Sequence, residues 1–231
     1  MLDLLPLFVI TAIYVTIILV VLWFSDIEKM EALLKLLTAF ALGFAAVVVA
    51  VSVESTFTLF IAASSIVMIV IVAPIVEEIA KIDMATRTFY KDMDEPEDSS
   101  IYGGCVALGF AFLENILYIL KYSFELTYLQ LADLTIARMF FSIPAHITAT
   151  VIGTATYWYL RKIVNMEELE SFTISIIPAA VLHATYNIIA LTGDLPILTA
   201  IVIIYIALTI LIWYLLRELK PSFHFEFATK I

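Results

Sequence analysis

Long apolar runs without a single charge are the feature that most limits how this chain can fold. One run, FTLFIAASSIVMIVIVAPIV at residues 57–76, ends directly before Glu77 and Glu78. Runs longer than about 18 residues predict membrane-spanning helices, because only helices and closed barrels satisfy every backbone group in lipid. The chain is 63% hydrophobic, and the alternation typical of barrel strands is absent. An all-α, polytopic membrane helical bundle is therefore predicted.

The apolar runs predict about seven transmembrane helices in one membrane domain, residues 1–231. Their approximate spans are 4–24, 31–53, 57–78, 101–121, 134–161, 171–191 and 195–217. The first span is expected to be retained, because no positively charged region precedes it and no small-residue cleavage site is evident. The catalytic core is expected within residues 57–191, with the first two spans and the last span at the periphery.

The placement of lysine and arginine predicts how the helices are oriented. Nine of the twelve Lys and Arg residues lie in the connectors after spans one, three and five or in the C-terminal tail. They are Lys29, Lys35, Arg87, Lys91, Arg161, Lys162, Arg217, Lys220 and Lys230. This bias predicts an N-terminus outside and a C-terminus in the cytoplasm.

Much of the formal charge of −10 lies in one connector, KDMDEPEDSS at residues 91–100. It lacks the ordered spacing and the turn glycine of a calcium-binding loop, so a solvated acidic cytoplasmic loop is expected. A basic surface for nucleic acid is absent. The expected partners are membrane lipid and a membrane-anchored protein or peptide, and the oligomeric state is left open. The single cysteine, Cys105, excludes an intramolecular disulfide.

Ionisable side chains inside membrane spans are costly and usually mark a functional site. They are Glu77, Glu78 and Lys81 at the end of the third span, Glu114 in the fourth, Arg138 and His146 in the fifth, and His183 with Asn187 in the sixth. At 1.5 Å per residue, Glu114, His146 and His183 lie roughly 18–20 Å into their spans, near the bilayer middle. Glu77 is expected deeper, toward the cytoplasm, unless a break near Pro74 brings it level.

Helical spacing groups these residues. Glu77 and Lys81 share a face at i,i+4, which favours Glu77 over Glu78 as the working carboxylate. His183 and Asn187 have the same spacing. Each feature alone also fits a structural role: a solvated helix end for the two glutamates, an interhelical hydrogen bond for a histidine, or snorkelling for Arg138.

Such a cluster has the groups that peptide-bond hydrolysis needs. A carboxylate shielded from bulk water is a suitable base for an attacking water, and N–H groups of histidine and asparagine can stabilise the oxyanion. This glutamate mechanism needs no cofactor. Zinc is the alternative, with Glu114, His146 and His183 as candidate ligands, although the HExxH pattern is absent. A non-catalytic scaffold and a proton-coupled transporter are the other classes considered.

Four motifs together resemble the PrsW family of intramembrane proteases. They are EEIAK, YGGCVALGFAFLENILY, PAHITAT and HATYN, within roughly residues 70–190. The pair Phe110 and Glu114, followed by Asn115, is particularly similar to that family. The wider group includes type II CAAX prenyl endopeptidases and bacteriocin-processing membrane proteins, but the CAAX enzymes usually have histidine at the place of Glu114.

The resemblance implies a glutamate-dependent intramembrane endopeptidase, with zinc dependence left open, in the cell membrane of a prokaryote. Glu77 would be the base with Glu78 beside it, and Glu114 would orient the water. His183 and Asn187 would bind the oxyanion. His146 matches a further family histidine, and Lys81, Arg138 and Asn115 would support the site. Relatives are linked to cleavage of membrane-anchored anti-sigma factors on the outer side of the membrane. The position expected for Glu77, in contrast, is toward the cytoplasmic side.

Overall fold

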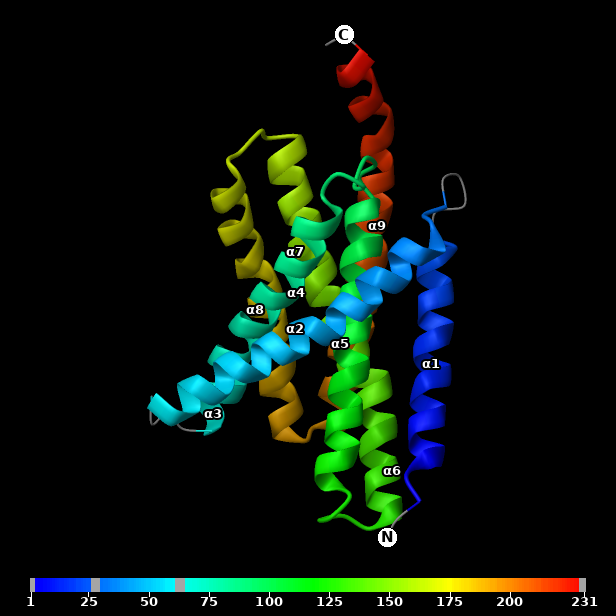
Figure 1. Ribbon diagram of the computed structural model, residues 1–231, viewed down its shortest axis with the longest axis vertical. Helices are drawn as coiled ribbons and strands as arrows, with labels where there is room; N and C mark the ends of the chain where they lie inside the picture. The colour runs from blue at the N-terminus through cyan, green and yellow to red at the C-terminus, as the bar shows by residue number, and fades with distance from the viewer. Residues whose placement is uncertain (1–2, 26–29, 61–64, 229–231) are drawn as a thin grey trace.

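The protein is a bundle of helices, seen here in a computed structural model that describes residues 3–25, 30–60 and 65–228 (Figure 1). In chain order the elements are α1 (Leu5–Trp23), α2 (Leu33–Phe60), α3 (Ser65–Val67), the π-helix η1 (Met68–Val72), α4 (Ala73–Phe89), α5 (Asp98–Tyr122), α6 (Tyr128–Ala137), the π-helix η2 (Arg138–Ser142), α7 (Ile143–Lys162), α8 (Glu168–Thr192) and α9 (Leu195–Ala228). The described residues contain no strand, which confirms the predicted all-α class.

Six of the described helices are long and apolar enough to cross a membrane. They cover Leu5–Trp23, Leu33–Leu59, Asp98–Tyr122, Tyr128–Lys162, Glu168–Thr192 and Leu195–Leu219. The third predicted span corresponds to α3, η1 and α4, which follow one another from residue 65 to residue 89 and carry more polar residues. Its predicted residues 61–64 lie outside the described residues, as do Lys29 and Lys230 of the charge bias.

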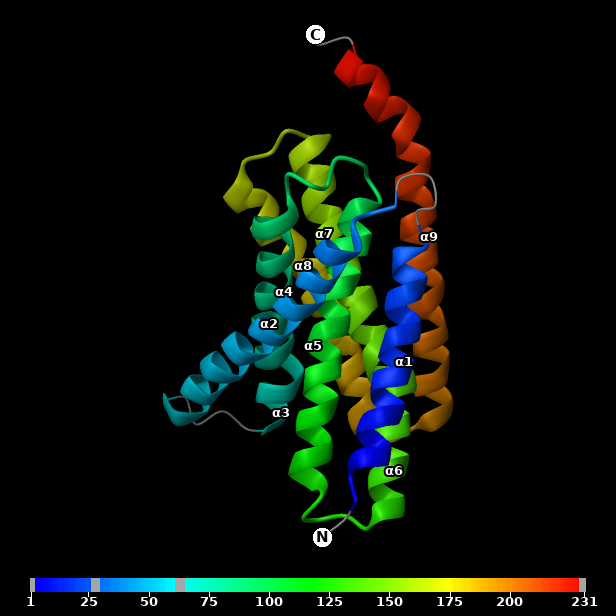
Figure 2. The ribbon, with the colours of Figure 1, turned by 45° about the vertical axis from the view of Figure 1, so that its right-hand side comes forward.

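Helices α5 and α7 lie at the centre of the bundle. Helix α5 packs against α2 on one side and α7 on the other, and α7 packs against α8. In the apolar stretch of α5, 61% of the residues are buried, whereas the corresponding shares are 17% for α1 and 11% for α9. Helices α1 and α9 therefore lie at the edge of the bundle. Helix α2, which was also expected at the periphery, instead crosses α5 diagonally and packs closely on it (Figures 1 and 2).

Two glycines allow α2 and α5 to approach closely. A Cβ atom at Gly109 would lie 1.9 Å from the carbonyl oxygen of Phe40, and one at Gly43 would lie 2.3 Å from that of Val106. Both clashes are with backbone atoms, so no side-chain rotation relieves them. Small residues at helix crossings serve this purpose in membrane bundles.

We therefore expect Gly109→Ala to lower the melting temperature in detergent by about 2–12 °C, the result of roughly 1–3 kcal/mol of overpacking. The matched control is Gly104→Ala in the same helix. There the nearest atom to an added Cβ belongs to the flexible side chain of Leu22, at 3.3 Å. Equal shifts for the two variants would contradict the close backbone approach at Gly109.

The acidic connector is packed rather than solvated, which corrects the expectation for residues 91–100. Glu97 and Asp98 are buried, and a carboxylate oxygen of Asp98 accepts the backbone N–H of Glu95 at 2.7 Å. The Trp158 indole donates to the carbonyl of Met93 at 3.1 Å. The Trp158 bond anchors the segment against α7, and three of its acids, Glu95, Glu97 and Asp98, are buried, whereas Asp92 is half-buried and Asp94 is exposed.

Candidate active site

Side chains from α2, α4, α5, α7 and α8 and from both π-helices surround one cavity of 450 Å³ inside the bundle. Its lining includes Val47, Ala50, Val51 and Glu54 of α2, Ile69 of η1, Ala73 and Glu77 of α4, Phe110, Glu114, Leu117, Tyr118 and Lys121 of α5, Arg138 and Ser142 of η2, His146 of α7, and His183, Tyr186 and Asn187 of α8. Every span in which the sequence predicts an ionisable site residue thus contributes to the cavity, and α2 adds a further wall.

Glu77 and Glu78 lie in the middle of a helical segment, not at its end. The segment runs from Ser65 to Phe89, with Glu77 twelve residues from each limit, which places it about 18 Å along the segment. The predicted span 57–78 thus lies too far toward the N-terminus, and Glu77 does not lie near the end of its helical segment. A solvated helix end is excluded as well, because Glu77 is 8% exposed and Glu78 is 0% exposed.

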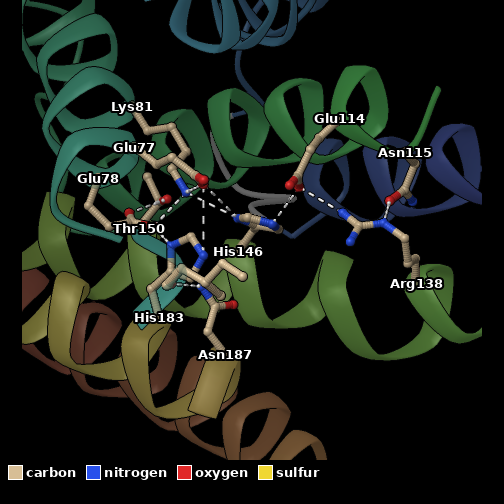
Figure 3. Close-up of polar contacts among 11 residues, drawn as sticks. Glu77, Glu78, Lys81, Glu114, Asn115, Arg138, His146, Thr150, His183 and Asn187 are labelled. Atoms are coloured by element: carbon tan, nitrogen blue, oxygen red, sulfur yellow. Dashed lines mark hydrogen bonds and ion pairs between the residues drawn. The ribbon is translucent and has the colours of Figure 1, made fainter. Parts of the chain in front are cut away.

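Glu78 is fully engaged by its neighbours. Its Oε1 accepts from the Lys81 ammonium at 2.5 Å and from His183 Nδ1 at 2.9 Å. Its Oε2 accepts from the Thr150 hydroxyl at 2.8 Å. With all three donors in place and no exposed surface, this carboxylate holds α4, α7 and α8 together and does not line the cavity (Figure 3).

Glu77 has the opposite environment. Its Oε2 is buried and accepts no hydrogen bond from the described residues. It lies 3.8 Å from His183 Nε2, 3.9 Å from His146 Nδ1 and 3.9 Å from the Lys81 ammonium. Lys81 therefore bonds to Glu78, not to Glu77 as the i,i+4 spacing suggested. Glu77 remains the better candidate for a different reason, because it alone of the pair lines the cavity.

The polar contacts assign the tautomers of both histidines. Lys81 can only donate, and it lies 3.2 Å from His146 Nδ1, so Nδ1 accepts and the N–H is on Nε2, 2.9 Å from Glu114 Oε2. The ion-paired Glu78 accepts from His183 Nδ1–H, which leaves a lone pair on His183 Nε2, facing Glu77. A neutral His183 therefore accepts at this atom, and its expected role as an oxyanion donor does not fit.

Glu114 is held by Arg138, and both side chains point into the bundle. The guanidinium lies 2.8 Å from Glu114 Oε2, donates to Asn115 Oδ1 at 2.8 Å, and stacks 3.6 Å from the Tyr118 ring centroid. Arg138 thus does not snorkel. It fixes Glu114, whose carboxylate in turn orients the His146 ring. The three expected supporting residues, Lys81, Arg138 and Asn115, all contact the cluster or its partners.

Asn187 lies one turn after His183 and lines the cavity, but one of its amide N–H groups is already used. Nδ2 donates to the carbonyl of Ile69 in η1 at 2.9 Å. Only its second N–H is available to another acceptor. Figure 3 shows this amide beside and below the His183 ring.

Glu54 is a cavity residue that the sequence reasoning misses, because the predicted second span ends at residue 53. Helix α2 continues to Phe60, so Glu54 lies on the cavity wall, and its Oε1 is buried without a hydrogen bond from the described residues. The signal was available in the sequence, since a helical period continued past residue 53 places Glu54 one turn after Ala50 on the same face.

Three side chains fit a metal ion. Glu77, His146 and His183 each offer one ligand atom, and these atoms lie within 4.8 Å of one another. One nitrogen of each histidine lies 2.9 Å from a carboxylate, that of Glu114 or Glu78, as is usual around metal-binding histidines. Glu77 thus replaces Glu114 in the expected ligand set. A metal on His146 Nδ1 would have to displace the Lys81 ammonium from that atom.

Two comparisons with known proteins indicate the family of this chain. The model of a family described as PrsW family intramembrane metalloprotease matches residues 31–215. The chain is also similar to Protease PrsW of Bacillus subtilis (strain 168), with 30% identity over 99 residues. That alignment spans 42% of this chain and 40% of the Bacillus protein, less than half the length of this relative. No solved structure matches.

The family match runs from just before α2 into α9, and so includes every element that lines the cavity. Together with the six apolar helices, it shows an integral, multi-pass membrane protein. The buried carboxylates and histidines lie within the matched region. The chain therefore belongs to the PrsW family of intramembrane proteases.

Proposed function

We propose that this protein is an intramembrane endopeptidase that cleaves a membrane-associated protein or peptide with a water activated by Glu77. The observation that carries the proposal is the buried Glu77 Oε2, which accepts no hydrogen bond from the described residues and lies 3.8 Å from His183 Nε2. That separation is too long for a hydrogen bond but suits one water bridging the two atoms.

In the proposed reaction the bridging water donates one hydrogen bond to Glu77 and the other to His183 Nε2. The water oxygen attacks the peptide carbonyl as Glu77 takes the proton. The protonated Glu77 then donates to the amide nitrogen, and the C–N bond breaks to give a carboxylic acid and an amine. Glu78 fixes the ring of His183, and the free N–H of Asn187 is the proposed oxyanion donor.

The proposed direction of entry follows from the cavity lining on α5. The lining residues run from Phe110 to Lys121, toward the Tyr122 end of the helix, which lies at the same end of the bundle as the start of α1 (Figure 1). With the orientation favoured by the charge bias, the substrate enters from the outer side. The substrate that fits this route is a protein or peptide anchored in the same membrane.

The test is a cleavage assay with the purified protein in lipid vesicles. Single-pass peptides of varied sequence are incubated with it, and new peptide ends are identified by mass spectrometry. We expect cuts that cluster at one depth in the transmembrane sequence. If no peptide is cut by a protein whose thermal transition shows that it is folded, the peptidase proposal is lost, and a non-catalytic scaffold becomes the better interpretation.

A metal held by Glu77, His146 and His183 would supply Lewis-acid polarisation of the carbonyl and of the water. Our proposal uses the glutamate alone, because Lys81 already occupies the lone pair of His146 Nδ1 and carries a like charge to any metal ion. We therefore expect cleavage to persist after dialysis against a strong chelator. Metal content of the same sample, measured by elemental analysis, provides the control. Activity that is lost on chelation and restored by Zn²⁺ would replace the glutamate mechanism by a metal mechanism.

A further inference from the structure

The contact between Asn187 and Ile69 has its origin in the backbone of η1. In this π-helix each N–H reaches the carbonyl five residues back, and the N–H of Ala73 bonds to the carbonyl of Met68 in this way. The next donor in the ladder would be residue 74, and its acceptor would be the carbonyl of Ile69. Residue 74 is proline, which has no N–H, so the ladder leaves the Ile69 carbonyl without that partner.

The amide of Asn187 takes the place of the missing donor. Its Nδ2 lies 2.9 Å from the Ile69 oxygen, although the two residues are 118 positions apart in the chain. Helix α8 packs directly on η1 and on α4. The bond therefore joins α8 to η1, directly before the helix that carries Glu77.

We infer that Pro74, Ile69 and Asn187 act as one unit. Pro74 creates the free carbonyl, the carbonyl fixes the direction of the Asn187 amide, and the bond ties α8 to the start of α4. Ile69 and Pro74 are therefore positioning residues for the cavity. The part of this inference that concerns turnover rests on the proposed function, while the hydrogen-bond unit itself does not.

The second π-helix repeats the backbone arrangement on the other side of the cluster. In η2 the N–H of Ile143 bonds to the carbonyl of Arg138, and the next residue is Pro144. His146 lies two positions after Pro144, and Glu77 lies three positions after Pro74. Single π-helical turns are frequent at functional sites, and here each one comes just before a residue of the cluster.

The test is a double-mutant cycle on thermal stability in detergent. Asn187→Ala removes the donor, and we expect it to lower the melting temperature by about 1–6 °C, the equivalent of one hydrogen bond. Pro74→Ala returns a backbone N–H to the Ile69 carbonyl. In that background we expect Asn187→Ala to cause no further shift. An equal shift in both backgrounds would overturn the inference.

Pro178→Ala supplies the matched control, because Pro178 lies inside α8 and outside the cavity lining. The decreases in melting temperature caused by Pro178→Ala and by Asn187→Ala should therefore add in the double variant. Asn187→Asp keeps the size of the side chain but presents only acceptors to the carbonyl when ionised, so it should destabilise at least as much as Asn187→Ala. If Pro74→Ala does not fold, the two Asn187 variants decide alone: lowered melting temperatures support the inference, and unchanged ones overturn it.

Measuring kcat together with the melting temperature distinguishes a failure of this inference from a failure of the proposed function. In the cleavage assay, Pro74→Ala and Asn187→Ala should each lower kcat, and the double variant should lose no more than the worse single variant. A wild-type protein that cuts nothing, together with coupled melting temperatures, would remove the peptidase proposal and leave the hydrogen-bond unit intact. Additive losses of kcat and of stability would remove the unit and leave the peptidase.

Discussion

Glu77→Gln is expected to lower the rate of peptide cleavage by about 10²–10⁴-fold, the usual contribution of a general base. Glutamine has nearly the same shape but cannot take a proton from the bridging water. Because Glu77 Oε2 accepts no hydrogen bond from the described residues, the substitution should leave the melting temperature close to that of the wild type. The measurement is single-turnover cleavage of one peptide, with thermal unfolding of the same preparation.

Glu54→Gln is the matched control for this prediction. Glu54 lines the same cavity and also has a buried oxygen without a hydrogen bond from the described residues. It lies on α2, however, and the described ion pairs of both histidines are with Glu77, Glu78 and Glu114. Glu54→Gln should keep most of the wild-type rate. Equal losses for the two variants would show that cavity charge, and not the position of Glu77, governs the rate.

Lys81→Met is expected to cause the largest loss of stability. The Lys81 side chain is 0% exposed, and its ammonium bonds to Glu78 at 2.5 Å and to His146 at 3.2 Å. Removing one partner of a buried ion pair leaves the other charge uncompensated, which costs about 3–5 kcal/mol. The melting temperature should fall by about 6–20 °C, measured by thermal unfolding in detergent.

A second ion pair on the same helix provides the control. Arg87 pairs with Asp83, and the side chain of Arg87 is 74% exposed. Arg87→Met should shift the melting temperature by no more than about 4 °C, because exposed pairs contribute roughly 0–1 kcal/mol. Adding Glu78→Gln to Lys81→Met should recover part of the decrease in melting temperature, because neither position 78 nor position 81 then carries a buried charge. A shift for Lys81→Met no larger than that for Arg87→Met would contradict the buried pair.

The sequence predicts the helices well wherever polar residues bound an apolar run. The fourth span is predicted at 101–121, and the helix runs from residue 98 to 122. The third span is misplaced because residues 57–76 are apolar almost throughout and uncharged, so no charged residue marks where α2 ends and the next helix begins. Hydropathy measures burial in lipid and does not register a change of direction within an apolar run.

Most of the charged residues of the candidate site can be predicted from the sequence, although Glu54 is missed, but their contacts cannot. Costly ionisable groups in four spans indicate Glu77, Glu114, His146 and His183, and the structure brings them together around one cavity. Which glutamate pairs with Lys81 depends on side-chain rotamers and on groups that reach Glu78 from other helices, the Thr150 hydroxyl and the His183 ring. Helical spacing within one segment cannot supply that information.

The central claim is that this cavity hydrolyses peptide bonds within the membrane through Glu77. The most direct measurement is mass spectrometry of a single-pass peptide incubated in vesicles prepared in ¹⁸O-labelled water. We predict a new C-terminus inside the transmembrane sequence that carries ¹⁸O with the wild type and is absent with Glu77→Gln. An intact peptide with the folded wild type, or the same labelled product at the same rate with Glu77→Gln, would contradict the claim.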